Sequence, residues 1–212
     1  MARLLVVLDV DSTLVENEVI ELLAEDAGSL AEVADITSRA MNGELDFAES
    51  LRSRVSTLAG LPESVFASVR TRVTVTNGVD ELVAGVHAAG GVIGVVSGGF
   101  AEIVDPLARE LKLDYWRANR LEVVDGFLTG RVLGAIIDAK AKASAINEWA
   151  LDSGTPMHRT VAVGDGANDL LMMHEAALSV GFDAKAPVRE RADVVLTVRD
   201  LSQVLALVGL RG

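Results

Sequence analysis

Short apolar runs alternate along the chain with longer stretches in which apolar residues recur at helical spacing. The runs have the length of buried strands, and a helical pattern separates most of them from the next. Such alternation is typical of an α/β fold, in which helices cover both faces of a parallel sheet. The predicted strands are Leu4–Leu8, Val92–Val96, Thr160–Val163, Leu178–Val180 and Val194–Thr197, and the predicted helices are a segment from about Asn77-Gly78 and the segments Gly99–Leu111, Lys140–Leu151, Ala167–Ala177 and Leu201–Val208.

Two segments interrupt this alternation. The first runs from about residue 16 to residue 75 and contains three helical patterns and no convincing strand. These patterns fall near Glu18–Ala40, Asp46–Leu58 and Pro62–Arg70. In the second segment, Asp125-Gly126 stands between two apolar runs, which is a strong signal for a β-hairpin. We therefore predict a helical insertion between the first two core strands, and a hairpin over residues 121–132.

Composition and net charge limit the size of the fold and the kinds of partner that we expect. The chain has 212 residues, of which 50% are hydrophobic, enough for one α/β domain with an insertion. It has no cysteine, which excludes disulfides and thiol chemistry. A formal net charge of −12 disfavours nucleic acid and anionic membranes as partners, because their phosphates need a basic surface. No apolar run approaches the roughly 18 residues of a membrane span, and Leu4–Leu8 is too short for a signal peptide, so we expect a cytoplasmic protein.

Three of the predicted strands end in polar strings, two of which contain glycines. In a parallel α/β sheet, ligands bind beyond the carboxyl ends of the strands. If the three strands are neighbours, the strings meet at one edge of the sheet. The strings are Asp9-Val10-Asp11-Ser12-Thr13, Ser97-Gly98-Gly99 and Gly164-Asp165-Gly166-Ala167-Asn168-Asp169.

Together these strings supply the parts of a phosphoryl-transfer site. Asp9 and Asp165 offer the hard oxygen ligands that Mg²⁺ prefers. Ser97 offers a hydroxyl, and the glycines after it let backbone N–H groups approach a phosphate at the start of a helix. Lys142 supplies a positive charge near the start of a later helix. Each feature alone is more often a turn, a helix cap or a solvated charge, and it is their combination that indicates the site.

These residues resemble the haloacid dehalogenase superfamily of aspartate-nucleophile phosphatases. The superfamily's four motifs are matched in order by Asp9-x-Asp11-x-Thr13, Ser97, Lys142 and the string Gly164–Asp169. Further strings are similar to the phosphoserine phosphatases of that superfamily: Asp11–Val15 with Glu18, Met41-x-Gly43, Phe47, Ser50–Val55, Val95–Phe100 and Ala118–Leu121. Val10 stands where that family has Phe, a difference that affects packing more than chemistry.

The resemblance implies a Rossmann-like core with a small helical cap inserted after the first strand. The core would comprise residues 1–15 and 76–212, and the cap residues 16–75. The cap would select the substrate, with Glu18 pairing with an ammonium group and Arg54 with a carboxylate. Met41 and Phe47 would form an apolar wall. The implied substrate is O-phosphoserine, released as serine in the last step of serine biosynthesis by a monomer or homodimer that binds neither nucleic acid nor membrane.

The mechanism that we infer has two steps. Asp9 attacks phosphorus and becomes an aspartyl phosphate. Asp11 first donates a proton to the serine oxygen and then activates water. Mg²⁺ would be held by Asp9, the Asp11 backbone carbonyl and Asp165. The groups expected to bind the phosphoryl oxygens or the substrate are Ser97, Gly98, Gly99, Lys142 and Asn168, with Thr13 and Asp169 supporting them.

Two alternatives stay open at this level. A related phosphatase or phosphotransferase could act on another small phosphorylated amino acid or amine, because Glu18 and Arg54 do not exclude phosphothreonine. A phosphate- or metal-binding scaffold that has lost turnover is disfavoured, because Asp9, Asp11 and Lys142 are all present. His87, His158 and His174 have no metal-ligand spacing, and we expect structural roles for them.

Overall fold

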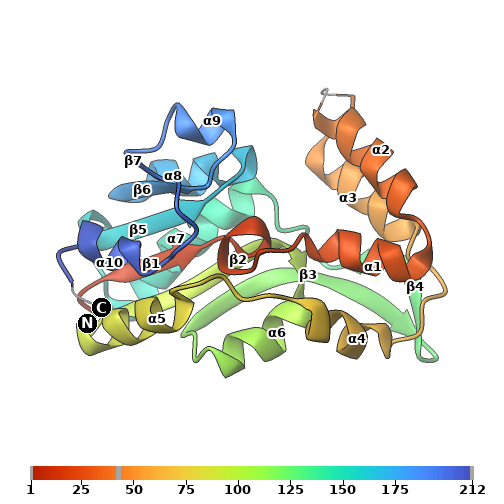
Figure 1. Ribbon diagram of the computed structural model, residues 1–212, viewed down its shortest axis with the longest axis horizontal. Helices are drawn as coiled ribbons and strands as arrows, with labels where there is room; N and C mark the ends of the chain where they lie inside the picture. Colours follow the sequence, from red (N-terminus) through yellow and green to blue (C-terminus); the bar gives the residue numbers. More distant parts are fainter. Residues whose placement is uncertain (1, 42–43, 211–212) are drawn as a thin grey trace.

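The computed structural model describes residues 2–41 and 44–210 and contains a seven-stranded sheet of order β4-β3-β2-β1-β5-β6-β7 (Figure 1). Adjacent strands run parallel except for the antiparallel pair β3–β4. The α/β class is therefore confirmed, and so are all five predicted core strands. The strands are β1 Leu5–Leu8, β2 Val92–Phe100, β3 Tyr115–Val124, β4 Phe127–Leu133, β5 Thr160–Gly164, β6 Leu178–Phe182 and β7 Val194–Leu196.

Helices cover both faces of this sheet. On one face α5, α6 and α10 pack against the even-numbered side chains Val6 and Leu8 of β1. On the other face α7, α8 and α9 pack against Leu5 and Val7, because successive residues of a strand point to opposite faces. The bounds of these helices are α5 Val79–Ala88, α6 Ala101–Glu110, α7 Ala139–Ser153, α8 Leu170–Glu175, α9 Ala186–Arg189 and α10 Gln203–Leu207.

The segment between β1 and β2 is helical, as predicted. Its helices share a second apolar core with Leu121 and Leu128 of the β3–β4 hairpin, so they lie beside that end of the sheet (Figure 1). The two ends of the insertion meet in an antiparallel bridge between Val15 and Val75. This bridge supports a division at residues 16–75, which stays a prediction. The helices are α1 Val19–Ala27, α2 Leu30–Met41, α3 Phe47–Ser56 and α4 Val65–Arg72.

Several predicted helix bounds were wrong. The pattern Glu18–Ala40 is two helices, because Gly28 adopts φ 68° and ends α1. The helix predicted from Gly99 begins at Ala101, since β2 continues to Phe100. The pattern Ala167–Ala177 holds a 3₁₀ turn before α8 and stops at Glu175. In each case helical spacing of apolar residues extends past the point where the backbone changes direction.

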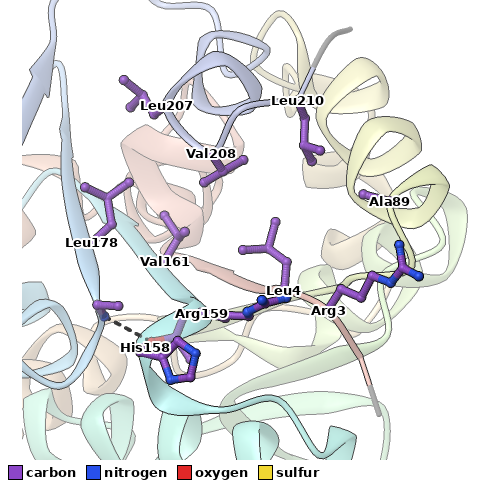
Figure 2. A pocket seen from close by; sticks show the side chains of 12 residues that line it. Arg3, Leu4, Ala89, His158, Arg159, Val161, Leu178, Leu207, Val208 and Leu210 are labelled. Carbon is purple, nitrogen blue, oxygen red and sulfur yellow. Dashed lines mark hydrogen bonds between the residues drawn. The ribbon is translucent and has the colours of Figure 1, made fainter.

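A cavity of about 590 Å³ opens at the amino ends of β1, β5 and β6 (Figure 2). Leu4, Val161 and Leu178 line it, with Arg3 and Arg159 near them. Ligands of parallel α/β sheets bind at the opposite, carboxyl edge. We therefore place the candidate active site at the carboxyl edge and not in this cavity. None of the helices in the described part of the chain is long and apolar enough to cross a membrane.

The helix α3, which carries Phe47 and Arg54, begins with a reciprocal pair of hydrogen bonds. Asp46 Oδ1 accepts from the Glu49 N–H at 2.8 Å, and Glu49 Oε2 accepts from the Asp46 N–H at 3.1 Å. We expect Asp46→Ala to lower the free energy of unfolding by about 1 kcal/mol, because the first turn of α3 loses its cap. Urea denaturation measures this loss. Asp35→Ala on the exposed face of α2 is the matched control, and equal effects of the two substitutions would contradict the capping role.

Candidate active site

The three polar strings do meet at one edge of the sheet. The first string follows β1, the second ends β2 and the third follows β5, and β1 pairs in parallel with both β2 and β5. Leu8 lies opposite Val95 on one side and Val163 on the other, so the polar strings begin within two residues of the same level of the sheet. The three strands are neighbours, so the prediction that their polar strings meet at one edge of the sheet is confirmed.

Asp11 lies in a tight turn that aims its carboxylate at the insertion. Asp11 and Ser12 have the backbone angles of a type II turn, with Ser12 at φ 59°. One Asp11 carboxylate oxygen accepts from the Val19 N–H of α1 at 2.8 Å, and the other from Ser97 Oγ at 3.1 Å. Burial raises the pKa of Asp11, although these hydrogen bonds oppose the rise. A carboxyl group in this position can be protonated, and it is not one of the three carboxylates that cluster around Asp165 in the described part of the chain.

Lys142 is buried between two carboxylates. Its Nζ lies 2.5 Å from Asp9 Oδ1 and 2.7 Å from Asp169 Oδ1, and only 1% of the residue is exposed. Burial by itself lowers the pKa of Lys142, but Asp169 and Asp9 outweigh it and raise the pKa above its usual value. Lys142 therefore places a buried positive charge beside the Asp9 carboxylate, and its expected contact with a phosphoryl group stays a prediction.

The carboxylates at this edge outnumber the cations that contact them. Asp9, Asp165 and Asp169 each place an oxygen within 4.8 Å of the others, and all three residues are buried. Burial, and then the charge of Asp169, raise the pKa of Asp9 well above its usual range. A divalent cation would keep Asp9 ionised, and a set of hard carboxylate oxygens suits Mg²⁺. The carboxylates of Asp9 and Asp165 therefore fit the expected metal, and the Asp169 carboxylate adjoins them.

Gly98 and Gly99 lie so close to other groups that a side chain would not fit at either position. A Cβ on Gly98 would lie 2.9 Å from the Phe47 ring, and one on Gly99 would lie 2.6 Å from Asp11 Oδ2. The Gly99 N–H donates to Ser97 Oγ at 2.7 Å, and the Gly98 carbonyl accepts from Asn119 at 2.8 Å. The contact at Gly98 places Phe47 of α3 next to the expected phosphate site.

Glu18 and Arg54 extend the site toward the insertion. Glu18 Oε1 accepts from Ser12 Oγ at 2.8 Å. Burial, and then the nearby Asp11 carboxylate, raise the pKa of Glu18 to about 7. Burial lowers the pKa of Arg54, and the nearby charges of Glu18 and Asp11 oppose this change. The Met41 side chain lies outside the described part of the structure, so its expected place in the apolar wall stays a prediction.

The remaining predicted residues lie in the same region. Asn168 is half-buried in the turn after β5, where its side chain would obstruct a Cβ on Gly166. Thr13 is buried, and its Oγ1 has no hydrogen-bond partner among the residues that the structure describes. Sequence reasoning missed Lys185, whose Nζ lies 2.9 Å from Asp165 Oδ2. Lys185 follows β6 closely, so the strand-end rule that identified the other strings could have found it.

Replacing Lys142 with Met leaves the carboxylates of Asp9 and Asp169 buried without their cation. We expect the metal-free protein at pH 7 to lose about 3–5 kcal/mol of unfolding free energy, because an uncompensated buried charge is costly. Urea denaturation in the presence of a chelator measures the loss. Lys140→Met, at an exposed position of the same helix, should change stability by less than about 0.5 kcal/mol. Similar effects of both substitutions would show that the buried ion pairs do not support the fold.

Known proteins are similar to this chain over nearly its whole length. The phosphoserine phosphatase of Streptococcus thermophilus is 50% identical over 203 residues, which cover 96% of this chain and 94% of that protein. The phosphoserine phosphatase of Mycobacterium tuberculosis is 52% identical over 206 residues, covering 97% of this chain but 50% of that protein. The chain thus spans nearly all of one relative and half of the other.

Solved structures show the same fold. A phosphoserine phosphatase described as a phospho-aspartyl intermediate analogue superposes with a TM-score of 0.91 at 42% identity, covering 98% of this chain and 99% of that one. A substrate-bound phosphoserine phosphatase complex gives the same TM-score of 0.91 and 42% identity, with the same coverage of 98% and 99%. The sequence model described as haloacid dehalogenase-like hydrolase matches residues 6–174. The chain therefore belongs to the haloacid dehalogenase-like hydrolase family.

Proposed function

We propose that this chain is a Mg²⁺-dependent phosphomonoester hydrolase that converts O-phosphoserine to serine and phosphate, the last step of serine biosynthesis. The observation that carries the proposal is the arrangement of two unlike aspartates beside one buried cation. Asp9 contacts Lys142 and belongs to the carboxylate cluster, whereas the Asp11 carboxylate contacts Ser97 and Val19. The similar phosphoserine phosphatases support the choice of substrate. A cytoplasmic location and a monomeric or homodimeric state stay predictions from the sequence.

Asp9 is the nucleophile of the proposed reaction. Its carboxylate oxygen forms a bond to phosphorus while the bond between phosphorus and the serine oxygen breaks. The departing oxygen takes a proton from Asp11, whose raised pKa favours the protonated form at the start. Asp11 then accepts a proton from water, the water oxygen bonds to phosphorus, and the Asp9 carboxylate leaves. Atoms and charges balance over the two steps, and both aspartates return to their initial states.

The metal would be held by Asp9, Asp165 and the Asp11 backbone carbonyl, with the Asp169 carboxylate adjoining. When bound, Mg²⁺ supplies positive charge that neutralises the carboxylates and the phosphate, which otherwise repel one another. Asp169 keeps a role of its own, because its two oxygens accept from Lys142 and from the Gly166 N–H at 3.1 Å. It therefore holds Lys142 and the turn after β5 in place.

The phosphoryl oxygens are bound by groups from three elements. Lys142 supplies charge from α7, and Ser97 with the Gly98 N–H supplies neutral donors from the end of β2. The Gly99 N–H, which was also expected to bind the substrate, instead donates to Ser97 Oγ and holds that hydroxyl in place. Asn168 adds an amide from the turn after β5. Fixed donors aimed at a phosphoryl group stabilise the charge of the transition state without reorganising when it forms.

The cap residues account for selection of an amino acid. Glu18 has a carboxylate for the substrate ammonium, and Arg54 has a planar guanidinium that suits bidentate binding of the substrate carboxylate. Phe47 lies against Gly98, so the cap approaches the phosphate site closely enough for one small molecule to touch both. Met41 is the predicted second member of the apolar wall.

A phosphate-release assay with and without Mg²⁺ tests the function and the nucleophile together. We expect release from phosphoserine only with Mg²⁺, weaker release from phosphothreonine, and the weakest from phosphoethanolamine, which lacks the carboxylate for Arg54. Asp9→Asn should lower kcat by at least a thousandfold, since it removes the nucleophile. Asp152→Asn, on the exposed side of α7, is the control and should leave kcat unchanged. Near-normal turnover by Asp9→Asn would refute the assigned nucleophile, and equal rates on all three compounds would refute the assigned substrate.

The pKa of Glu18 predicts a pH dependence of substrate binding. Because the carboxylate form pairs with the ammonium, we expect KM for phosphoserine to rise about tenfold when the pH falls from 8 to 6 through the pKa of about 7. Glu18→Gln cannot titrate, so its KM should be high at both values and should vary only as the substrate itself titrates. Glu21→Gln, exposed on the same helix, should keep the wild-type profile. A wild-type profile in Glu18→Gln would assign the titration to another group.

A further inference from the structure

Arg199, which lies late in the sequence, contacts the turn at residues 10–13 that carries Asp11. We call this segment the catalytic turn. Arg199 lies between β7 and α10, and its Nη2 donates to the Ser12 carbonyl at 3.1 Å. Its Nη1 lies 3.1 Å from Asp183 Oδ2, and its guanidinium stacks over the Phe182 ring at 5.5 Å from the centroid. One side chain therefore joins the loop after β1 to the loop after β6.

Both loops have an unfavourable backbone conformation at the residue that Arg199 contacts. Ser12 has φ 59° and Asp183 has φ 43°, in the left-handed region where residues with a Cβ are disfavoured. Such a conformation persists only where the surrounding structure holds it. The guanidinium supplies one contact to each of the two residues, and its planar fork suits two partners at once.

The conformation of Ser12 determines the position of two functional groups. Ser12 is the third residue of the type II turn, and its φ sets the orientation of the preceding peptide, which carries the Asp11 carbonyl. Its Oγ donates to Glu18, and its N–H donates to the Asn17 carbonyl at 3.2 Å. A relaxed Ser12 would therefore turn the Asp11 carbonyl and release Glu18.

We propose that Arg199 is a positioning residue that holds Ser12 in its left-handed conformation and thereby fixes the turn that carries Asp11. Its contribution to turnover rests on the proposed function, whereas its hold on the turn does not. Arg199 is not one of the residues that are expected to bind the substrate or the metal. Its effect passes through the backbone of residues 9–13.

Arg117 provides a matched control within the same chain. Its side chain is 32% exposed, as is that of Arg199, and it pairs with Glu148 at 2.6 Å. Its guanidinium lies over the Trp149 ring at 5.7 Å from the centroid. Arg117→Ala therefore removes an ion pair and an aromatic contact of the same kind, but no contact to the catalytic turn.

The experiment compares Arg199→Ala with Arg117→Ala by amide hydrogen exchange and by kinetics on phosphoserine. In Arg199→Ala we expect exchange in residues 10–18 to accelerate at least tenfold and kcat to fall about tenfold to a hundredfold, because small displacements of catalytic groups are costly. Arg117→Ala should show neither effect. Exchange in residues 10–18 that matches the control, or a kcat within twofold of it, would overturn the proposal.

Two further measurements keep the outcome decisive. If Arg199→Ala does not fold, Arg199→Lys is compared with Arg117→Lys, since an ammonium keeps the charge but cannot reproduce the two-pronged contact. Arg199→Lys should then show the faster exchange in residues 10–18 and the lower kcat, and no difference between the two would refute the positioning role. If the wild-type protein releases no phosphate, the proposed function fails, and the exchange comparison alone still decides whether Arg199 holds the turn.

Discussion

The buried contact of Lys142 with Asp9 and Asp169 is the interaction on which the rest of the site depends. It joins the carboxyl end of β1, the first turn of α7 and the turn after β5, which are far apart in the sequence. An ammonium group loses its hydration when buried, so it must contact both carboxylates to be stable there. Those two carboxylates adjoin Asp165, and this excess of negative charge is what makes a divalent cation fit the site.

The two aspartates of the first string differ because their surroundings differ. Asp9 is next to Lys142 and two other carboxylates, whereas Asp11 accepts a hydrogen bond from Val19 at the start of α1. The bond to Val19 has a structural consequence, since it ties the proposed proton donor to the first helix of the insertion. Movement of α1 would therefore change the environment of Asp11 as well as the position of Glu18, and it would connect the proposed substrate selection with the proposed proton transfer.

The sequence predicted the core of the site because its parts follow a simple topological rule. Asp9, Ser97 and Asp165 each stand at a strand end, and parallel strands bring such ends together. The first half of β3 was missed, since residues 115–120 include Arg117 and Arg120 and are mostly half-buried, so they lack the apolar run of a central strand. Lys185 stands just after β6, where the same strand-end rule could have found it. Arg199 could not be found in this way, because its contacts depend on the geometry of the loops after β6 and β7, which residue spacing does not encode.

The positions of the charges explain how a chain with a negative net charge can bind an anionic substrate. The formal net charge of −12 acts mainly through exposed carboxylates, whose field is screened within about 8 Å at physiological ionic strength. Lys142 and Arg54 act from buried or half-buried positions, where screening is much weaker. The repulsive surface therefore lowers the rate of encounter more than the affinity of the site. A large polyanion would have to contact that surface and would be repelled by it, whereas a single small phosphomonoester could reach the buried cations.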